Sequence, residues 1–397
     1  MVKRAHILFI VENNSVPFDR RVWHEACSAR DFGYEVSVIC PTDKRSHDNR
    51  SLIDSIRIYR HPCPIEGLKR WAMLFEYLNA FFWESLLALR LFLKRPFSVI
   101  HGANPPDHIF LIALPFKIAG VKFVFDQHDL VPETYVAKYG AKSIVYRILL
   151  WVERLSFRAA DIVISTNESY KKIAIERGSK SDGDVIVVRN GPDVTMVSPP
   201  LPRPELLGGF RHLIGYVGVI GKQDGIENLL AVADYIVKKR QRRDIKFAVV
   251  GSGPNLKNLI RDAKAMALDG YVHFFGFVSE ELLLEILTAS DICINPEFRN
   301  EFTDKSTMIK IMEYMALKKP IVQFYTTEGE FSAGDAAISI RDNDIVQFGD
   351  AILALLGDPA RRARMGDVGR ERIEKQLSWP IQAKKLEAVY DRIIPSH

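Results

Sequence analysis

The sequence lacks a hydrophobic run long enough to cross a membrane, and it lacks paired cysteines. No stretch of about 20 uninterrupted apolar residues occurs. The four cysteines, Cys27, Cys40, Cys63 and Cys293, are scattered and do not have the spacing of a zinc site or a disulfide framework. We therefore expect reduced thiols and a cytoplasmic protein.

A secretion signal and a nucleic-acid-binding motif are also missing. The first residues, MVKRAHILFIVENN, combine a basic pair with a short apolar run, but Glu12 interrupts the run and no small-residue cleavage site follows. This segment is better interpreted as a first buried strand. We expect neither DNA nor RNA as a partner.

What is present is an alternation of short apolar runs and amphipathic stretches, which is typical of βα units around a parallel sheet. The runs are AHILFIV, EVSVIC, FSVIHG, KFVFDQ, ADIVIST and DVIVVRN, and then HLIGYVG, IKFAVVGSG, VHFFGF, DICINP, KPIVQF and AAISI. Between the two series, SPPLPRPELLGG has a linker composition. A chain of 397 residues suits two domains.

We therefore predict an α/β protein with two Rossmann-like domains that face a central cleft. The predicted divisions are residues 1–197, a linker at 198–210, a second domain at 211–378, and a C-terminal helix at 379–397 that returns to the first domain. Ligands of such folds bind at the carboxyl ends of the strands.

The segment TDKSTMIKIMEYMA, residues 303–316, is the most informative candidate for a site. On a helix, Lys310 and Glu313 lie one turn apart, with Lys305 near the start. Cations and the helix dipole suit an anion, and Glu313 can accept hydrogen bonds from vicinal hydroxyls. The same spacing also suits a solvated ion pair, and the residues alone leave that alternative open.

The stretch KIMEYMALKKPIV resembles the donor-binding segment of retaining glycosyltransferases of family four, and the resemblance covers nearly the whole chain. It implies a GT-B fold and a nucleoside diphosphate sugar as donor, for which UDP is the expected nucleotide. We expect no metal or other cofactor. In that family, the glutamate that matches Glu313 holds the ribose diol.

The glycine loop YVGVIGKQDGIENLL, which contains Gly218 and Gly221, departs from the family pattern. The family has an arginine and a lysine there that clamp the diphosphate, whereas this sequence has Ile220 and Asp224. A buried diphosphate needs balancing cations. The candidates that remain open are Lys222, Lys305 and Lys310.

A second departure concerns the donor sugar. The family has two carboxylates, the first of which touches the sugar, but that position here is Lys305, with Asp304 beside it. A lysine there would tolerate an acidic donor such as a uronate, could turn to the phosphates, or could simply be exposed. By the same resemblance, the donor-binding set includes Gly251, Gly276, Phe277, Val278, Asn295 and Ser306.

In the first domain, VFDQHDLVPETY places three polar groups just beyond a predicted buried strand. A histidine flanked by acids can be held as one tautomer or as a cation. The segment resembles the Asp-x-His-Asp segment of bacterial polysaccharide glycosyltransferases, where the histidine faces the sugar and the acceptor. The predicted acceptor-binding residues are Asn14, Asp19, Arg20, Arg21, Asn104, Asp126 and His128.

Residues 68–97, LKRWAMLFEYLNAFFWESLLALRLFLKRPF, predict a membrane-facing surface. They are rich in Trp, Phe and Leu, have basic ends, and suit an amphipathic helix on an anionic leaflet. All of the excess positive charge lies in residues 1–197, which hold 27 Lys and Arg against 22 Asp and Glu. The helix predicted at 141–160 belongs to the same face in this interpretation. The alternative is a helix packed on the sheet.

The prediction from sequence is a retaining, metal-independent hexosyltransferase that uses a UDP-sugar and a lipid-linked glycan acceptor in surface polysaccharide biosynthesis, on the cytoplasmic face of the inner membrane. The expected route is front-face attack, with positioning and charge stabilisation by the protein. The predicted catalytic residues are His128, Asp129, Lys310 and Glu313. The main alternative is a non-catalytic subunit that binds a nucleotide sugar or a partner enzyme. The linkage, the sugar and the oligomeric state stay open.

Overall fold

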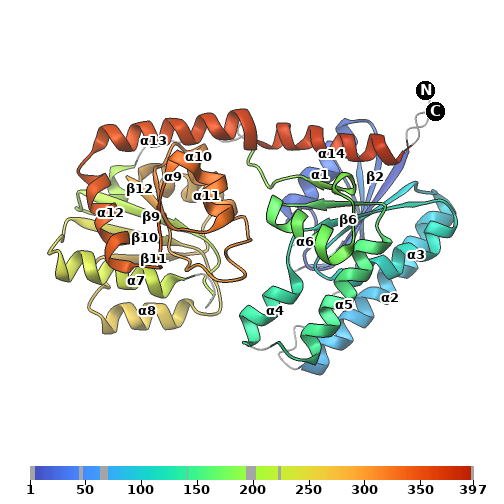
Figure 1. Cartoon of the computed structure of the whole chain (residues 1–397), viewed down its shortest axis with the longest axis horizontal. Coiled ribbons are helices and arrows are strands. Elements are labelled where there is room, and N and C mark those ends of the chain that lie inside the picture. The colour runs from blue at the N-terminus through green and yellow to red at the C-terminus, as the bar shows by residue number, and fades with distance from the viewer. Residues whose placement is uncertain are drawn as a thin grey trace. The chain divides into compact units, whose positions relative to one another are not determined.

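The computed structural model describes residues 5–43, 48–62, 70–140, 142–193, 203–221 and 225–394, without the side chains of 70–76 and 204. The chain folds as two compact units (Figure 1). Unit 1 comprises Met1–Arg189 and Gln382–His397, and unit 2 comprises Asn190–Ile381. Residues 198–202 of the predicted linker lie outside the described part. A short helical turn, Pro204–Leu207, follows within unit 2.

Unit 1 is built on an eight-stranded sheet with the order β3-β4-β2-β1-β5-β6-β7-β8. All neighbouring strands are parallel except β3 and β4. Its strands are β1 (His6–Val11), β2 (Glu35–Pro41), β3 (Arg50–Ile53), β4 (Ile56–His61), β5 (Val99–Ala103), β6 (Lys122–Gln127), β7 (Ile162–Ser165) and β8 (Val185–Val187). Its helices are α1 (Arg20–Asp31), α2 (Arg70–Lys94), α3 (Phe110–Ile118), α4 (Val131–Tyr139), α5 (Ile144–Ala159), α6 (Glu168–Gly178) and the part of α14 (Trp379–Ile393) from Gln382.

The antiparallel hairpin of β3 and β4 is absent from the strands predicted from sequence. Asp54 and Ser55 connect the two strands, and both have positive φ, at 47° and 65°. Two such residues form the tight turn that suits the twist of a hairpin. The sequence Asp-Ser lacks the glycine that normally marks this turn, which explains why the pattern was missed.

Helices cover both faces of the unit 1 sheet. Helices α2, α3, α5 and α6 pack on one face around Leu8, Ile10 and Phe125. On the other face, His101 of β5 stacks on Phe9 of β1 and contacts Glu25 of α1 and Tyr390 of α14. Helices α1 and α14 are labelled in Figure 1. Among the described residues, no helix has both the length and the apolar character that a membrane crossing requires.

Helix α2 has two apolar sides. Ala80, Ala88 and Leu91 are buried on the sheet, as expected of a crossover helix. Phe82 and Leu93 are 59% and 75% exposed on the opposite side. Helix α2 therefore packs on the sheet through one stripe, as the alternative expects, and the predicted contact of the other stripe with a membrane stays a prediction. Residues 68 and 69 lie outside the described part.

Unit 2 contains a fully parallel six-stranded sheet with the order β11-β10-β9-β12-β13-β14. Its strands are β9 (His212–Val217), β10 (Ile245–Val250), β11 (Val272–Gly276), β12 (Ile292–Asn295), β13 (Ile321–Phe324) and β14 (Ala337–Ile340). Its helices are α7 (Ile226–Asp234), α8 (Leu256–Ala265), α9 (Glu280–Ala289), α10 (Ile309–Ala316), α11 (Thr327–Ala333), α12 (Ile345–Leu356) and α13 (Pro359–Arg372).

The strand order of unit 2 reverses between β9 and β12, so the loops after these strands leave in opposite directions and open a crevice at that edge. Tyr314 on α10 spans this point. Its hydroxyl accepts from Val217 N at 2.9 Å and donates to Ile294 O at 3.4 Å, which ties α10 to both strands. The tyrosine ring is fully buried. The two parallel α/β domains expected from the sequence are thus confirmed, and α10 is anchored at the switch point of the second.

Candidate active site

The loop after β9 holds Gly218 and Gly221 and packs on the loop after β10. Gly218 N donates to Val250 O at 3.1 Å, and Gly251 N donates to Gly276 O at 2.9 Å. Gly251 has a φ of 138°, and a Cβ atom on it would lie 1.8 Å from Gly218 O. Only glycine permits two backbones to approach this closely. Gly251 therefore shapes the glycine loop by its lack of a side chain.

Ile220, at the position of the family arginine, is a core residue. Its side chain is buried, its N–H donates to Ser252 O at 3.1 Å, and its carbonyl accepts from Asn255 N at 3.0 Å. This position consequently supplies packing and no charge. Lys222 and Asp224 lie outside the described residues, so the predicted diphosphate contact of Lys222 stays a prediction.

Lys310 reaches the start of the glycine loop. Its Nζ lies 2.5 Å from Glu297 Oε1 and 3.2 Å from the Tyr216 hydroxyl, and it stands over the Tyr216 ring at 4.7 Å from the centroid. A Cβ atom on Gly218 would lie 3.1 Å from Lys310 Nζ. Burial alone would lower the pKa of Lys310, but the Glu297 carboxylate outweighs it and the pKa lies above its ordinary value. The ammonium is therefore a permanent charge beside the glycine loop.

Glu313 lies one turn after Lys310 on the same helix and is half-buried. The N-cap residue of α10, Met308, makes no side-chain hydrogen bond to the first turn. The start of a helix favours anions because its amides point outward. Helix α10 thus brings Glu313 and Lys310 together at its first turns, as the sequence predicted. The contact of Glu313 with the ribose stays a prediction.

Lys305 and Ser306 precede α10 and lie in a turn held by Asp304. The Asp304 carboxylate accepts from Thr327 N at 2.8 Å and pairs with Arg299 at 3.0 Å. Burial acts against ionisation, but the Thr327 amide and the Arg299 guanidinium outweigh it and lower the pKa of Asp304. Ser306 Oγ donates into the turn, to a backbone carbonyl at 2.9 Å. Asp304 is thus a structural anchor, which leaves half-buried Lys305 beside the helix start.

The remaining predicted donor residues lie at the carboxyl ends of two strands of the unit 2 sheet, β11 and β12. Asn295 ends β12 and is buried, and its Oδ1 has no hydrogen-bond partner among the described residues. Gly276 ends β11, and the next residue, Phe277, is 86% exposed. Val278 is half-buried. A buried acceptor without a partner is costly and is normally satisfied by water or a ligand.

A second cluster lies in unit 1, at the carboxyl ends of β1, β5 and β6. Arg21 donates two hydrogen bonds to Asp126, from Nε at 3.1 Å and from a terminal nitrogen at 2.8 Å. It also pairs with Glu25 at 3.0 Å and donates to Val188 O at 3.0 Å. Arg21, Glu25 and Asp126 are all buried. Arg21 and Asp126, predicted as acceptor-binding residues, therefore sit inside the unit and act on the residues around them.

Two histidines complete this cluster. His128 Nε2 contacts Asp126, and His101 Nε2 lies 3.4 Å from the same carboxylate. His101 Nδ1 also contacts the Tyr390 hydroxyl at 2.9 Å. Burial lowers the pKa of each histidine, but Asp126 outweighs it, so the pKa of His101 rises to about 9 and that of His128 also rises.

His128 is the member of the cluster that reaches the surface, with 12% of its side chain exposed. Arg21 outweighs burial and holds the pKa of Asp126 well below its ordinary value. This buried carboxylate favours a cationic His128, which can donate to a phosphate or a sugar hydroxyl. The sequence predicted the His128–Asp126 pairing, but it did not indicate Glu25, His101 or Tyr390.

Asn104 fixes the loop that carries His128 and Asp129. Its Oδ1 accepts from His128 N at 2.5 Å and Asp129 N at 3.1 Å, and its Nδ2 donates to Asp129 O at 2.8 Å. It also donates to Asp107 at 2.7 Å. Burial raises the pKa of Asp107 to about 8 and also raises that of Asp129. Asn104 is buried, so its described contacts are those of a positioning residue.

Asn14 and Asp19 lie in the loop between β1 and α1, and Arg20 is the first residue of α1. Asp19 caps α1 by accepting from Val22 N at 3.0 Å. Asn14 Oδ1 accepts from Ser15 N at 3.1 Å, and Asn14 and Arg20 are exposed. The predicted acceptor role of these three residues stays a prediction.

Within the described residues, one group has three metal-ligating atoms close together, within 4.8 Å: Glu25, Asp126 and His128. The Arg21 guanidinium contacts both carboxylates. A divalent ion among them would face that cation at contact distance, so these residues do not fit a metal site. Independence of metals stays a prediction.

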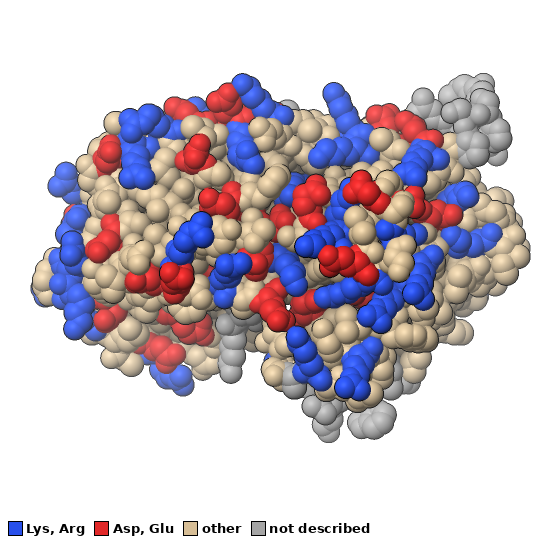
Figure 2. All heavy atoms as spheres, viewed as in Figure 1, with Lys and Arg blue, Asp and Glu red and all other residues tan. Residues whose placement is uncertain are grey.

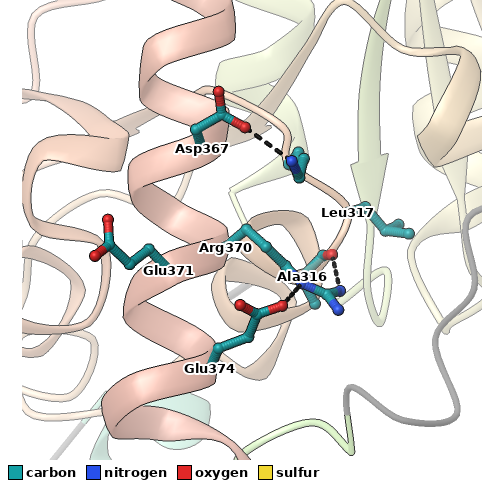
Figure 3. A pocket seen from close by; sticks show the side chains of 7 residues that line it. Ala316, Leu317, Asp367, Arg370, Glu371 and Glu374 are labelled. Atoms are coloured by element: carbon teal, nitrogen blue, oxygen red, sulfur yellow. Dashed lines mark hydrogen bonds and ion pairs between the residues drawn. The ribbon is translucent and has the colours of Figure 1, made fainter.

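A hollow of about 600 Å³ lies at the far end of α10 and is unrelated to the glycine loop (Figure 3). Arg370 crosses it, donating to Ala316 O at 2.7 Å and pairing with Glu374 at 2.5 Å. Its other lining residues include Lys318, paired with Asp367. On the face in Figure 2, basic and acidic side chains are interspersed over both units.

Comparison with known proteins assigns the family. A model described as glycosyl transferase 4-like domain matches residues 19–191, and a model described as glycosyl transferases group 1 matches residues 211–358. Alpha-maltose-1-phosphate synthase of Mycolicibacterium smegmatis is 24% identical over 298 residues, 69% of this chain and 74% of that protein. The capsular polysaccharide biosynthesis glycosyltransferase CapM of Staphylococcus aureus is 24% identical over 339 residues, 82% of this chain and 84% of that protein.

Solved structures share the fold over the full length. Sucrose-phosphate synthase from Thermosynechococcus elongatus has a TM-score of 0.78 at 19% identity and covers 98% of this chain and 99% of its own. Anabaena HepE in complex with UDP-glucose has a TM-score of 0.73 at 14% identity and covers 98% and 100%. The chain therefore belongs to the group 1 glycosyltransferases of family four and has the GT-B fold.

Proposed function

We propose that this glycosyltransferase moves a sugar from a nucleoside diphosphate sugar to a lipid-linked glycan acceptor in surface polysaccharide biosynthesis. The preferred donor is a UDP-sugar. The observation that carries the proposal is the convergence of the glycine loop, Lys310 and Glu313 at the switch point of unit 2. The structurally similar Anabaena protein holds UDP-glucose, and CapM acts in capsular polysaccharide biosynthesis. Both support this donor and this product class.

The proposed reaction retains configuration and needs no metal. Glu313 accepts hydrogen bonds from the ribose diol, and the Lys310 ammonium offsets the charge that develops on the departing diphosphate. The leaving phosphate oxygen takes the acceptor proton as the new glycosidic bond forms. His128, kept cationic by Asp126, orients sugar hydroxyls, and Asp129 beside it accepts from them. Positioning and charge stabilisation supply the rate enhancement.

The donor assignment is tested by incubating the purified protein with UDP, GDP and dTDP sugars, uronates included, with membrane extract as the source of acceptor. We expect one donor both to raise the melting temperature and to release its nucleotide, with no change on adding a chelator. Glu313→Ala and His128→Ala should each lower turnover about 10- to 100-fold, the size expected for lost charge-assisted hydrogen bonds. Glu371→Ala, at an exposed glutamate of α13, is the matched control. Unchanged turnover in both site variants would contradict the assignment.

The second candidate is a non-catalytic subunit that binds a nucleotide sugar. The buried side chain of Ile220 favours it, because this position carries no phosphate-binding charge. Thermal stabilisation by a donor without nucleotide release, even with acceptors supplied, would support this alternative.

The acceptor's lipid is proposed to be reached through an apolar surface of unit 1. Its exposed apolar side chains come from α2, α3 and α5. They are Tyr77, Leu78, Phe82, Leu89, Leu93, Leu111, Leu114, Ile118, Ile144, Val145, Ile148 and Trp151. The exposed charged side chains of α2 from residue 77 and of α5 are all basic, and the acids Glu84 and Glu153 are buried. An apolar face flanked by basic residues fits the anionic cytoplasmic leaflet.

This membrane contact is tested by sedimentation with vesicles of phosphatidylcholine, with and without phosphatidylglycerol. Removing two large apolar side chains costs several kcal/mol of burial, about 1.5–3 kcal/mol each when fully buried. We therefore expect Ile148→Ser/Trp151→Ser to lower partitioning into anionic vesicles at least about tenfold. The control is Ile260→Ser/Val368→Ser, at exposed apolar positions of unit 2. Equal partitioning of the two double variants would remove the support for this surface.

A further inference from the structure

We propose that Glu297 is a positioning residue for the donor diphosphate: it holds the Lys310 ammonium against the glycine loop, where this ammonium replaces the cations missing from the loop. The inference rests on the proposed function, because it concerns the phosphate contact of that same donor site. Glu297 follows β12 and belongs to none of the motifs recognised in the sequence.

Lys310 lies at the beginning of the glycine loop, and Glu297 lies at its end. At its beginning, a Cβ atom on Gly218 would lie 3.1 Å from Lys310 Nζ. At its end, Gly225 has a φ of 68°, and a Cβ atom there would lie 2.9 Å from Glu297 Cα. The two described ends of the loop therefore lie beside the Lys310 ammonium and beside the backbone of Glu297.

The ion pair is buried and leaves one donor of the ammonium unused. Only 11% of the Lys310 side chain and 4% of the Glu297 side chain are exposed. An ammonium has three N–H donors, and two are directed to Glu297 and Tyr216. Lys310 has no further hydrogen-bond partner among the described residues. The remaining donor is free for a phosphate oxygen that approaches the glycine loop.

A buried lysine needs a nearby negative charge to stay protonated, because burial disfavours the charged form. The titratable groups around Lys310 are Glu297, Tyr216 and, one turn along α10, Glu313. Glu297 is the carboxylate in direct contact. Without it, the ammonium would lose both its counter-ion and the hydrogen bond that directs it.

The first test is calorimetric titration with UDP, GDP, dTDP and ADP. Lys310→Met should lower the affinity for the nucleotide that the native protein binds by about 10- to 100-fold, the effect expected for the loss of a charge-assisted hydrogen bond. Lys318→Met, at an exposed lysine just beyond the same helix, should bind as the native protein does. Lys310→Met leaves Glu297 buried alone and can misfold, so the neutral double variant Glu297→Gln/Lys310→Met accompanies it and should bind equally weakly.

The second test separates positioning from mere packing. Glu297→Gln keeps the shape of the side chain and one acceptor but removes the negative charge. In this variant, Lys310 should therefore lose its proton at a lower pH than in the native protein. It should regain the proton when a diphosphate binds. Between pH 7.5 and 9.5, its nucleotide affinity should fall with rising pH by up to about tenfold per unit, while the native protein stays flat. Titration in buffers of different ionisation enthalpy should show proton uptake in the variant and none in the native protein.

The outcomes distinguish the inference from the proposed function. If the native protein binds no nucleoside diphosphate, both fail. If it binds one and Lys310→Met binds it equally well, the inference alone is overturned. Parallel pH profiles for Glu297→Gln and the native protein would also overturn the role of Glu297.

Discussion

Gly251→Ala is expected to abolish nucleotide binding and to destabilise unit 2 by several kcal/mol. The new Cβ atom would lie 1.8 Å from Gly218 O, which is backbone and cannot rotate away. Forcing an atom into a packed site costs about 1–3 kcal/mol or more. The φ of 138° adds about 1–3 kcal/mol, because side chains disfavour that region. The glycine loop must therefore move, and it takes with it the surface against which Lys310 rests.

Gly209→Ala is the matched control, at a glycine of unit 2 outside the predicted donor-binding set. Gly209 also has positive φ, at 88°, but a Cβ atom there meets nothing within 4 Å. We expect only the conformational cost, about 1 kcal/mol, and retained nucleotide binding. Calorimetry with the preferred nucleoside diphosphate and urea denaturation compare the two. If both substitutions lowered stability and nucleotide affinity equally, the predicted clash between the new Cβ atom and Gly218 O would be contradicted.

Asp126→Asn is expected to lower the free energy of unfolding of unit 1 by about 3–5 kcal/mol, the cost of breaking a buried ion pair by removing one partner. The amide cannot accept both hydrogen bonds from Arg21, and its N–H₂ group would face other donors. Only Glu25 would then balance the buried guanidinium. Turnover should fall as well, because His128 loses the carboxylate that orients it.

Tryptophan fluorescence can follow this loss in urea. Four of the five tryptophans lie in unit 1, and a Trp379→Phe background removes the fifth. Asp184→Asn, at a partly exposed aspartate paired with Arg392, should cost under about 1 kcal/mol. A similar loss of unfolding free energy in Asp126→Asn and Asp184→Asn would contradict the view that burial makes the Asp126–Arg21 pair important for stability.

The stability of the same cluster should depend on pH in a defined direction. The pKa of His101 is raised to about 9 in the folded protein, so its contribution is complete below its unfolded pKa near 6.5 and is lost as the pH rises through 9. The pKa of Asp126 is depressed, so its contribution is present above pH 4 and is lost as the pH falls further. Asp126→Asn should flatten both slopes, because it removes the carboxylate that titrates in acid and that helps to raise the pKa of His101.

The regular parts of the fold could be predicted from local patterns. Each of the twelve runs listed from the sequence contains a strand of the structure. The central strands, such as β1, β5, β7 and β12, are buried on both faces, and continuous apolar runs of this length suit that environment. The exception, β3 and β4, lies at the sheet edge with alternating exposure, and its turn uses Asp54 and Ser55 in place of the usual glycine.

The candidate sites were predicted only where their residues are near in sequence. Lys310 and Glu313 share a helix, whose period places them one turn apart on the same face. Asp126 and His128 lie two residues apart at the end of one strand. Glu25 joins His128 and Tyr390 joins His101 from distant elements, and Glu297 joins Lys310 across a loop. No spacing in the sequence indicates such contacts.

The sequence by itself determined the α/β class, the tandem sheets and the position of the glycine loop, because hydrophobic periodicity and glycine content act locally. The tertiary structure alone decided which charges are paired and which are available. Asp304 and Lys310 are adjacent to the same helix start, but one is an anchor held by Thr327 and Arg299 and the other is a buried cation held by Glu297. Burial and counter-ions set the charge and direction of a side chain, and both depend on strands and loops that only folding brings together.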